Sequence, residues 1–366
     1  MTRPLRVLMT ADTMGGVWTY ALRLAEAFAA RGVETHIATM GECPRESQRR
    51  EASLIPGLQL HESTFKLEWM HAPWHDVAAA GDWLLALEAE LQPDVIHLNG
   101  YAHGALPWRA PHVVVGHSCV YSWWRAVHGT RPPLGYGRYE HAVRNGLAAA
   151  RAVAAPSRAM LAALRTHYGP VPQGEVIHNG LPPLRTAPVA KEPFVLCVGR
   201  LWDEAKNVQT AVQAADRIRW PFFLAGSTQH PDGWERDLGR VEHLGVLPAA
   251  TLAAWYARAA IFASPARYEP FGLSILEAAM NGCALVLSDI PSLRELWEDA
   301  ALFVPPDDAE ALAAAIERLS RNERLRTGYM QKARVAAGRY TLERCTDAYL
   351  ALYRRLLDSH IAREAL

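Results

Sequence analysis

Two glutamates flank a Phe-Gly dipeptide in the stretch RYEPFGLSILEAAMNG, residues 267–282. The apolar run IFASPA before it predicts a buried strand, and the pattern after Gly272 predicts an amphipathic helix that ends at Asn281-Gly282. Glu269 would then lie in the loop between strand and helix, and Glu277 about one turn into the helix. Since a carboxylate can accept two adjacent hydroxyls, this arrangement is suited to holding a ribose or another sugar.

The start of the predicted helix offers a second kind of contact. The amides of Phe271, Gly272 and Leu273 would have no intrahelical partner, so they could donate to hydroxyl or phosphate oxygens. The simpler interpretation, two helix-capping glutamates, fits a glutamate near a helix start. It does not fit Glu269, which precedes Pro270.

Two cations follow another predicted strand, in VGRLWDEAKN. Arg200 comes directly after the apolar run, and Lys206 lies six residues further on. A guanidinium fork and a lysine point charge at a strand's carboxyl end could hold a diphosphate. An isolated Arg/Lys pair is more often part of a solvated loop.

Gly15-Gly16 follow the first predicted strand and precede a helix. Glycine allows a close backbone approach, and the helix start favours an anion. The pair does not match G-x-G-x-x-G, so alone it indicates turn chemistry more strongly than phosphate binding.

Histidines suggest a metal only weakly. His71 and His75 have i, i+4 spacing, but Pro73 between them disfavours a continuous helix, and the sequence has no H-E-x-x-H motif or Cys/His cluster. We therefore expect no metal site and no cofactor. His117 stands at the end of the predicted strand HVVVGHS, where a buried structural histidine and a functional histidine are equally compatible with the pattern.

Residues 118–143 are rich in aromatics, glycine and proline and do not read as an ordinary core element. Sugars stack on aromatic rings and arginine binds anionic groups, so this segment could line an acceptor site. The equally weighted alternative is that the Trp-Trp pair anchors a long loop. The candidate acceptor residues are Trp123, Trp124, Arg125, Tyr136 and Arg138.

For these candidate residues to form one site, the fold must bring together the ends of the strands that precede them. The first 40 residues read as strand, glycine loop, helix and strand, and short apolar strands then alternate with helices. The pattern restarts after the proline-rich stretch 182–193, and the chain ends in helices. Such alternation predicts two α/β units, each with a parallel sheet covered on both faces, whose ligands lie at the strand C-termini.

Composition excludes several classes of protein. The 366 residues contain 38 Lys plus Arg and 38 Asp plus Glu, so no net field attracts nucleic acid. Five scattered cysteines without a C-x-x-C predict reduced thiols and a cytoplasmic protein. No uncharged apolar stretch approaches the roughly 20 residues that span a bilayer. Peripheral contact at the inner face of a membrane needs only one amphipathic surface, so the sequence leaves it open.

Several motifs, in the same order along the chain, resemble those of a known protein family. RYEPFGLSILEAAMNG is similar to the Glu-x7-Glu signature of family 4 glycosyltransferases, and the similarity includes the Gly-Gly loop, DVIHLNG, VVGHS, VIHNG, VGRLWDEAKN and LFVPPDDAEAL. It extends across nearly the whole chain. The resemblance implies the GT-B fold, two Rossmann-like domains facing across a crevice. The expected bounds are 1–186 for the acceptor domain, with the final helix at about 342–366 packing on it, and 187–341 for the nucleotide-sugar domain.

The resemblance also implies roles for the residues found above. Arg200 and Lys206 would bind the donor diphosphate, Glu277 the ribose, and Glu269 with the amides of Phe271 to Leu273 the donor sugar. From the other domain, Gly15 and Gly16 would close over the phosphates and acceptor. His117 would lie near the donor sugar.

Departures from the family pattern leave every charged group in place. Ala266 stands where the family often has serine, Ala284 where it usually has proline, and Lys206 follows Arg200 by six residues where five is common. These departures put only the shape of the phosphate loop in question.

The expected reaction is transfer of a sugar from a UDP- or GDP-sugar to an acceptor hydroxyl with retained configuration and without a metal, in polysaccharide or glycoconjugate synthesis. No carboxylate is clearly placed as a covalent nucleophile. Two alternatives remain: a nucleotide-sugar 2-epimerase on the same fold, and a non-catalytic scaffold that binds nucleotide sugars.

Overall fold

The computed structural model describes residues 3–171, 173–184, 189–230, 233–239 and 241–364. The chain divides into two compact units. The first comprises Met1–Ser122, Arg131–Gly180 and Leu342–Leu366, and the second comprises Trp123–Thr130 and Leu181–Thr341. The boundary expected between residues 186 and 187 lies outside the described residues.

The first unit is built on a seven-stranded parallel sheet with the order β3-β2-β1-β4-β5-β6-β7. Its central strands are short apolar runs buried on both faces, as parallel sheets require. The strands are β1 Arg6–Asp12, β2 Glu34–Met40, β3 Leu58–Glu62, β4 Val95–Leu98, β5 His112–Val115, β6 Ala152–Ala155 and β7 Gly174–Val176.

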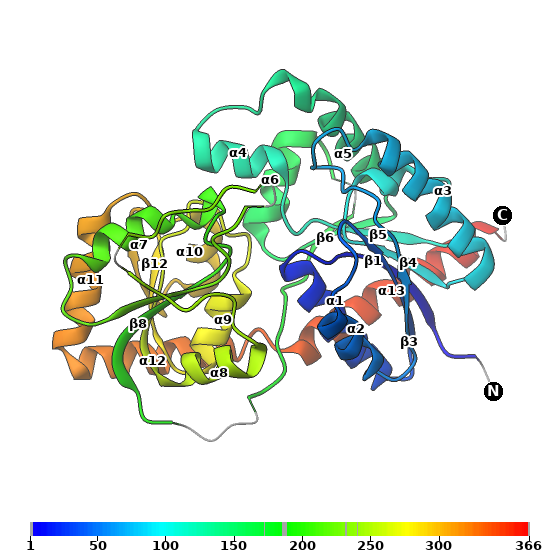
Figure 1. The fold of residues 1–366 in the computed structure, drawn as a ribbon. Coiled ribbons are helices and arrows are strands. Elements are labelled where there is room, and N and C mark those ends of the chain that lie inside the picture. The colour runs from blue at the N-terminus through cyan, green and yellow to red at the C-terminus, as the bar shows by residue number, and fades with distance from the viewer. Residues whose placement is uncertain (1–2, 172, 185–188, 231–232, 240, 365–366) are drawn as a thin grey trace. The chain divides into compact units, whose positions relative to one another are not determined.

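Helices cover both faces of this sheet (Figure 1). They are α1 Gly16–Ala29, α2 Glu46–Ser53, α3 Trp74–Leu91, α5 Gly137–Ala149, α6 Arg158–Tyr168 and α13 Leu342–Glu364, with short 3-10 turns at Ala102–Ala105 and Leu134–Tyr136. The helix α4 Val120–His128 begins in this unit, and its residues from Trp123 on belong to the second. The expected return of the final helix is confirmed, since Tyr349 and Tyr353 of α13 share one buried cluster with Phe28 of α1 and with Val7 and Met9 of β1.

The second unit contains a six-stranded parallel sheet with the order β10-β9-β8-β11-β12-β13. Consecutive residues of a strand point to opposite faces of the sheet, so they belong to different hydrophobic cores. Leu196 of β8 packs with Ile275 and Leu293, whereas Val195 packs with Val208 and Leu312. The strands are β8 Glu192–Val198, β9 Phe222–Ala225, β10 Glu242–His243, β11 Ala259–Ser264, β12 Ala284–Ser288 and β13 Ala301–Val304. The helices are α7 Val208–Ala215, α8 Ala249–Arg258, α9 Leu273–Met280, α10 Pro291–Trp297, α11 Ala309–Arg321 and α12 Glu323–Ala337, with a 3-10 turn at Glu204–Lys206.

The two parallel sheets with their covering helices confirm the predicted fold class. One local expectation was wrong: the aromatic-rich segment 118–143 is largely helical, in α4 and α5, and is not a long loop. Tyr121 and Tyr139 are buried there, and their parallel rings lie 6.5 Å apart. Across the described residues, every helix is too short or too polar to cross a lipid bilayer.

Candidate functional site

The loop after β8 carries the two predicted phosphate ligands. Arg200 donates from Nη2 to Oδ2 of Asp203 at 2.8 Å, while half of its side chain stays exposed. Asp203 is buried, and its Oδ1 accepts the amide of Ala205 at 3.0 Å, which caps the 3-10 turn that carries Lys206. Burial on its own would raise the pKa of Asp203. The charges of Arg200 and Lys206 outweigh it and hold this pKa below its ordinary value.

Lys206 and Glu269 form an ion pair between the loops that follow β8 and β11. These two strands are neighbours in the sheet, so their carboxyl ends lie at the same edge. The main-chain oxygen of Glu269 accepts the Ser292 hydroxyl at 2.6 Å, which holds the loop that presents the carboxylate.

The start of α9 has the conformation that the sequence predicts for an amide-lined turn. Gly272 is the N-cap, with φ +87°, and a Cβ there would lie 2.7 Å from Cδ1 of Ile275. Only glycine tolerates both conditions. Within the described chain the amides of Gly272 and Leu273 have no hydrogen-bond acceptor. Phe271 is buried against Tyr340, with ring centroids 5.5 Å apart, and this contact anchors the turn.

Glu277 lies on the same helix but has a different neighbour from Glu269. Its charge acts on the buried Tyr256 of α8, whose hydroxyl has no hydrogen-bond partner within the described residues. Burial and then the charge of Glu277 raise the pKa of Tyr256 well above its ordinary value. The two glutamates of the signature therefore have different neighbours: Glu269 pairs with Lys206, and Glu277 lies near Tyr256.

In the first unit, Gly15 and Gly16 begin α1 at the carboxyl end of β1. Gly15 is the N-cap, no side chain caps this end, and its φ of 172° is ordinary extended backbone. A Cβ at Gly16 would meet no atom within 4 Å. Internal packing therefore does not explain the choice of glycine at residue 16.

His117 follows β5 and is partly buried. Its Nε2 lies 2.8 Å from Oδ1 of Asn99, and its ring packs edge-on against Tyr20 with centroids 4.6 Å apart. Nε2 of His97 lies 3.1 Å from the same Asn99 oxygen, and Nδ1 of His97 lies 2.6 Å from the Tyr353 hydroxyl.

Burial keeps both imidazoles uncharged at neutral pH. It lowers the pKa of His117 to about 4, and burial together with the neighbouring His117 lowers the pKa of His97 to about 3. Asn99 and His97 were not predicted as site residues. The signal for them was the polar alternation in DVIHLNG, because i, i+2 residues of a strand share a face.

The five candidate acceptor residues contact different groups, and Trp123 and Trp124 also contact each other, with ring centroids 5.8 Å apart. Trp123 donates from Nε1 to Oδ1 of Asp203 at 3.1 Å, and Trp124 packs on His128 with ring centroids 4.5 Å apart. Arg125 donates to the Gly129 carbonyl at 2.6 Å.

The other two candidates have separate neighbours. Tyr136 packs edge-on against Tyr139, and the Arg138 guanidinium lies 4.9 Å from the centre of the Trp74 ring. The acceptor site stays a prediction.

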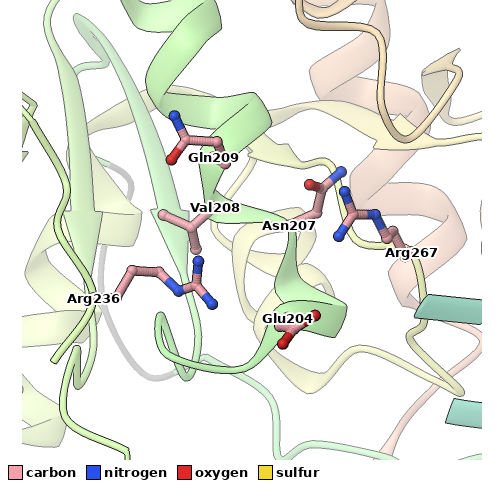
Figure 2. Close-up of a pocket in the computed structure, with 6 residues that line it drawn as sticks. All are labelled: Glu204, Asn207, Val208, Gln209, Arg236 and Arg267. Atoms are coloured by element: carbon pink, nitrogen blue, oxygen red, sulfur yellow. The ribbon is translucent and has the colours of Figure 1, made fainter. Parts of the chain in front are cut away.

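A cavity of about 200 Å³ lies beside the loop that follows β8, at the start of α7 (Figure 2). It is lined by Glu204, Asn207, Val208, Gln209, Arg236 and Arg267. Both arginines are engaged, Arg236 with the Trp202 carbonyl at 3.2 Å and Arg267 with Asp307 at 2.7 Å. The cavity contains none of the predicted donor ligands. Elsewhere in the described part of the chain, no group of three His, Cys, Asp or Glu side chains could hold a metal ion.

Two family models match successive parts of this chain. The model described as Glycosyltransferase Family 4 matches residues 14–185, and the model described as Glycosyl transferases group 1 matches residues 192–322. Together they match most of the chain, including both glutamates of the signature and the loop after β8. The chain belongs to the GT-B glycosyltransferases. The predicted resemblance to family 4 is thereby confirmed.

Curated relatives include O-antigen chain mannosyltransferase B of Escherichia coli, 31% identical over 193 residues that cover 48% of this chain and 49% of the relative. Glycogen synthase of Mycobacterium tuberculosis is 28% identical over 356 residues, 85% of both chains. This glycosyltransferase thus spans about half the length of the first relative and most of the second.

Solved structures agree with the GT-B architecture. Sucrose-phosphate synthase of Thermosynechococcus elongatus has a TM-score of 0.79 at 22% identity, covering 97% of this chain and 100% of that one. HepE of Anabaena in complex with UDP and glucose has a TM-score of 0.73 at 17% identity, covering 95% and 99%. At these identities the likeness establishes the fold.

Proposed function

We propose that this GT-B protein transfers a sugar from a UDP- or GDP-sugar to an acceptor hydroxyl, with retention of the anomeric configuration. The observation that carries the proposal is the grouping at one sheet edge of Arg200, the Lys206–Glu269 pair and the acceptor-free amides of Gly272 and Leu273. Cations and amides suit a diphosphate, and the carboxylates suit sugar hydroxyls.

The proposed chemistry depends on the leaving diphosphate. As the bond from the sugar to the diphosphate breaks, negative charge grows on the phosphate oxygens. Lys206 and Arg200 would stabilise it, as would the amides at the start of α9. Both cations are already positioned by carboxylates, Arg200 by Asp203 and Lys206 by Glu269, so little reorganisation is needed.

The remaining site residues would orient the donor. Glu277 would accept ribose hydroxyls, Glu269 would accept a hydroxyl of the transferred sugar, and His117 would contact the same sugar from the first unit. Gly15 and Gly16 would leave room for the phosphates and acceptor at the start of α1, where a Cβ at Gly16 would point into open space. The departing phosphate would help to deprotonate the acceptor hydroxyl, without a metal ion or other cofactor.

The acceptor would be a carbohydrate, a lipid-linked glycan or a small molecule. The relatives support a role in polysaccharide or glycoconjugate synthesis, since their names include an O-antigen chain mannosyltransferase, a phosphatidyl-myo-inositol mannosyltransferase and glycogen synthase. We propose a cytoplasmic location, with peripheral contact at the inner face of the membrane if the acceptor is lipid-linked.

The test is a transfer assay with UDP- and GDP-sugars and a panel of simple glycoside and lipid-linked acceptors, followed by NMR of the product. The proposal expects nucleotide release that depends on the acceptor, and a product with the anomeric configuration of the donor. An inverted product would refute the retaining mechanism. Conversion of the donor sugar without acceptor would favour the epimerase, and binding without turnover across the panel would favour the scaffold.

A further inference from the structure

Asn99 has only one arrangement of its side-chain amide that satisfies its neighbours. Its Nδ2 donates to the main-chain oxygen of Thr10 at 2.7 Å, and its backbone amide donates to the Thr10 hydroxyl at 2.9 Å. Since a carbonyl oxygen can only accept, Nδ2 must face Thr10. Oδ1 of Asn99 is thereby fixed as an acceptor on the opposite side.

Two imidazole nitrogens lie within hydrogen-bond distance of that oxygen, Nε2 of His117 at 2.8 Å and Nε2 of His97 at 3.1 Å. A carbonyl oxygen has two lone pairs, so it can accept from both. Neutral imidazole carries one proton, and the lowered pKa values of both rings keep them neutral. Each ring therefore places its proton on Nε2, and Nδ1 of His97 is left to accept the Tyr353 hydroxyl at 2.6 Å. The Tyr20 hydroxyl oxygen, 3.3 Å from Nε2 of His97, then accepts from that nitrogen as well.

The consequence for His117 is an exposed lone pair. With the proton on Nε2, Nδ1 is an acceptor. Among the described residues Nδ1 has no hydrogen-bond partner. It is accessible to solvent, because the buried side-chain nitrogens and oxygens that lack a partner do not include it. The edge-on contact with Tyr20 limits rotation of the ring.

The polar groups around this network are uncharged near neutral pH. Tyr20 of α1 and Tyr349, Tyr353 and Cys345 of α13 face it, and burial raises the pKa of each. On β4 the facing titratable group is His97. The environment therefore favours a neutral His117 in one tautomer.

We propose that Asn99 is a positioning residue that fixes the proton of His117 on Nε2, so that Nδ1 accepts a hydroxyl hydrogen from the sugar being transferred. The tautomer follows from the hydrogen bonds in the first unit alone. The sugar contact rests on the proposed function.

The first experiment measures the tautomer directly. Uniform 15N-histidine labelling and NMR at neutral pH distinguish a protonated from an unprotonated ring nitrogen, and the His117→Gln variant assigns the signal. The proposal expects His117 to be protonated on Nε2 and unprotonated on Nδ1. A proton on Nδ1, or an equal mixture of tautomers, would overturn it. This result needs no variant of Asn99 and no substrate.

The second experiment changes the acceptor. In Asn99→Asp a carboxylate replaces Oδ1, and an anion at this distance should raise the pKa of the adjoining histidines by about 1–3 units. Asn145→Asp is the matched control, because Asn145 lies 2.9 Å from Nε2 of His141 on an exposed face of α5. Asn99→Asp should shift the His117 titration, whereas Asn145→Asp should leave it unchanged. An unchanged His117 titration in folded Asn99→Asp protein would contradict control by residue 99.

A binding comparison separates this inference from the proposed function. At a pH where His117 of Asn99→Asp is protonated, Nδ1 becomes a donor. The sugar hydroxyl must then accept from Nδ1 and no longer donate to it, so the ratio of nucleotide-sugar affinity to nucleoside-diphosphate affinity should change about tenfold relative to wild-type protein at the same pH. Equal losses for both ligands would overturn the sugar contact. If wild-type protein binds no nucleotide sugar, the proposed function fails, and the NMR result still decides the tautomer.

Discussion

Lys206 and Glu269 join the loops after two neighbouring strands, and both side chains are mostly buried at that junction. The sequence predicted that Lys206 binds a diphosphate and that Glu269 binds a sugar. The structure adds that the two side chains form an ion pair with each other. Neutralising either residue leaves the other charge partly buried without its partner. The pair therefore positions two predicted donor ligands while limiting the electrostatic cost of burying their charges.

Removal of the Glu277 carboxylate should weaken nucleoside binding selectively. In Glu277→Gln, affinity for UDP or GDP should fall about tenfold, because an amide accepts ribose hydroxyls less strongly than a carboxylate. Affinity for the 2′,3′-dideoxy nucleotide should change little. Isothermal titration with both ligands measures the difference, and exposed Glu298→Gln is the control. Equal losses for ribo- and dideoxy-nucleotides would place Glu277 away from the ribose.

Asp203 should contribute its full stabilisation above its ordinary pKa and lose it at lower pH. Its folded pKa lies below the ordinary 3.8, so its contribution is complete above that value and is lost as the pH falls through the lower, folded pKa. In Asp203→Asn the free energy of unfolding should depend less on pH in this acidic range. Urea denaturation between about pH 2 and pH 7 measures this, with exposed Asp216→Asn as the control. Identical pH profiles for the wild type and Asp203→Asn would show that the ion pair with Arg200 does not form in solution.

Gly16→Ala should separate function from folding. A Cβ at this helix start meets no atom within 4 Å, so the free energy of unfolding should stay equal or rise by about 0.5–1 kcal/mol. Transfer activity should fall, because the methyl group occupies space that the proposal reserves for ligand.

Gly146→Ala provides the opposite control, since its Cβ would lie 1.8 Å from the Tyr101 carbonyl and should destabilise the first unit. Thermal melts and initial rates measure both effects. Full activity in a stable Gly16→Ala protein would remove Gly16 from the site.

The sequence predicted the parts of the fold that depend on periodicity. The helix after Gly272 begins and ends where the sequence predicts. The helix α4 was missed because it is only nine residues long and is followed directly by the glycine- and proline-rich residues 129–137.

The sequence predicts which side chains are candidates for binding the donor, but it does not predict which other side chains they contact. Strand-end positions identify Arg200 and Lys206 as candidates, since parallel strands bring their carboxyl ends to one edge. Which carboxylate each cation meets depends on loop conformation, so the roles of Asp203 and Asn99 appear only in three dimensions.

Calorimetric titration of nucleoside diphosphates into Lys206 variants tests the donor site most directly. Wild-type protein should bind UDP or GDP, and Lys206→Met should lose about 1.5–3 kcal/mol of binding free energy, roughly 10–100-fold in Kd. Lys206→Arg should retain part of the affinity, and exposed Lys332→Met should retain all of it. Wild-type affinity for the nucleotide in folded Lys206→Met protein, or no nucleotide binding by the wild type at millimolar concentration, would contradict the account.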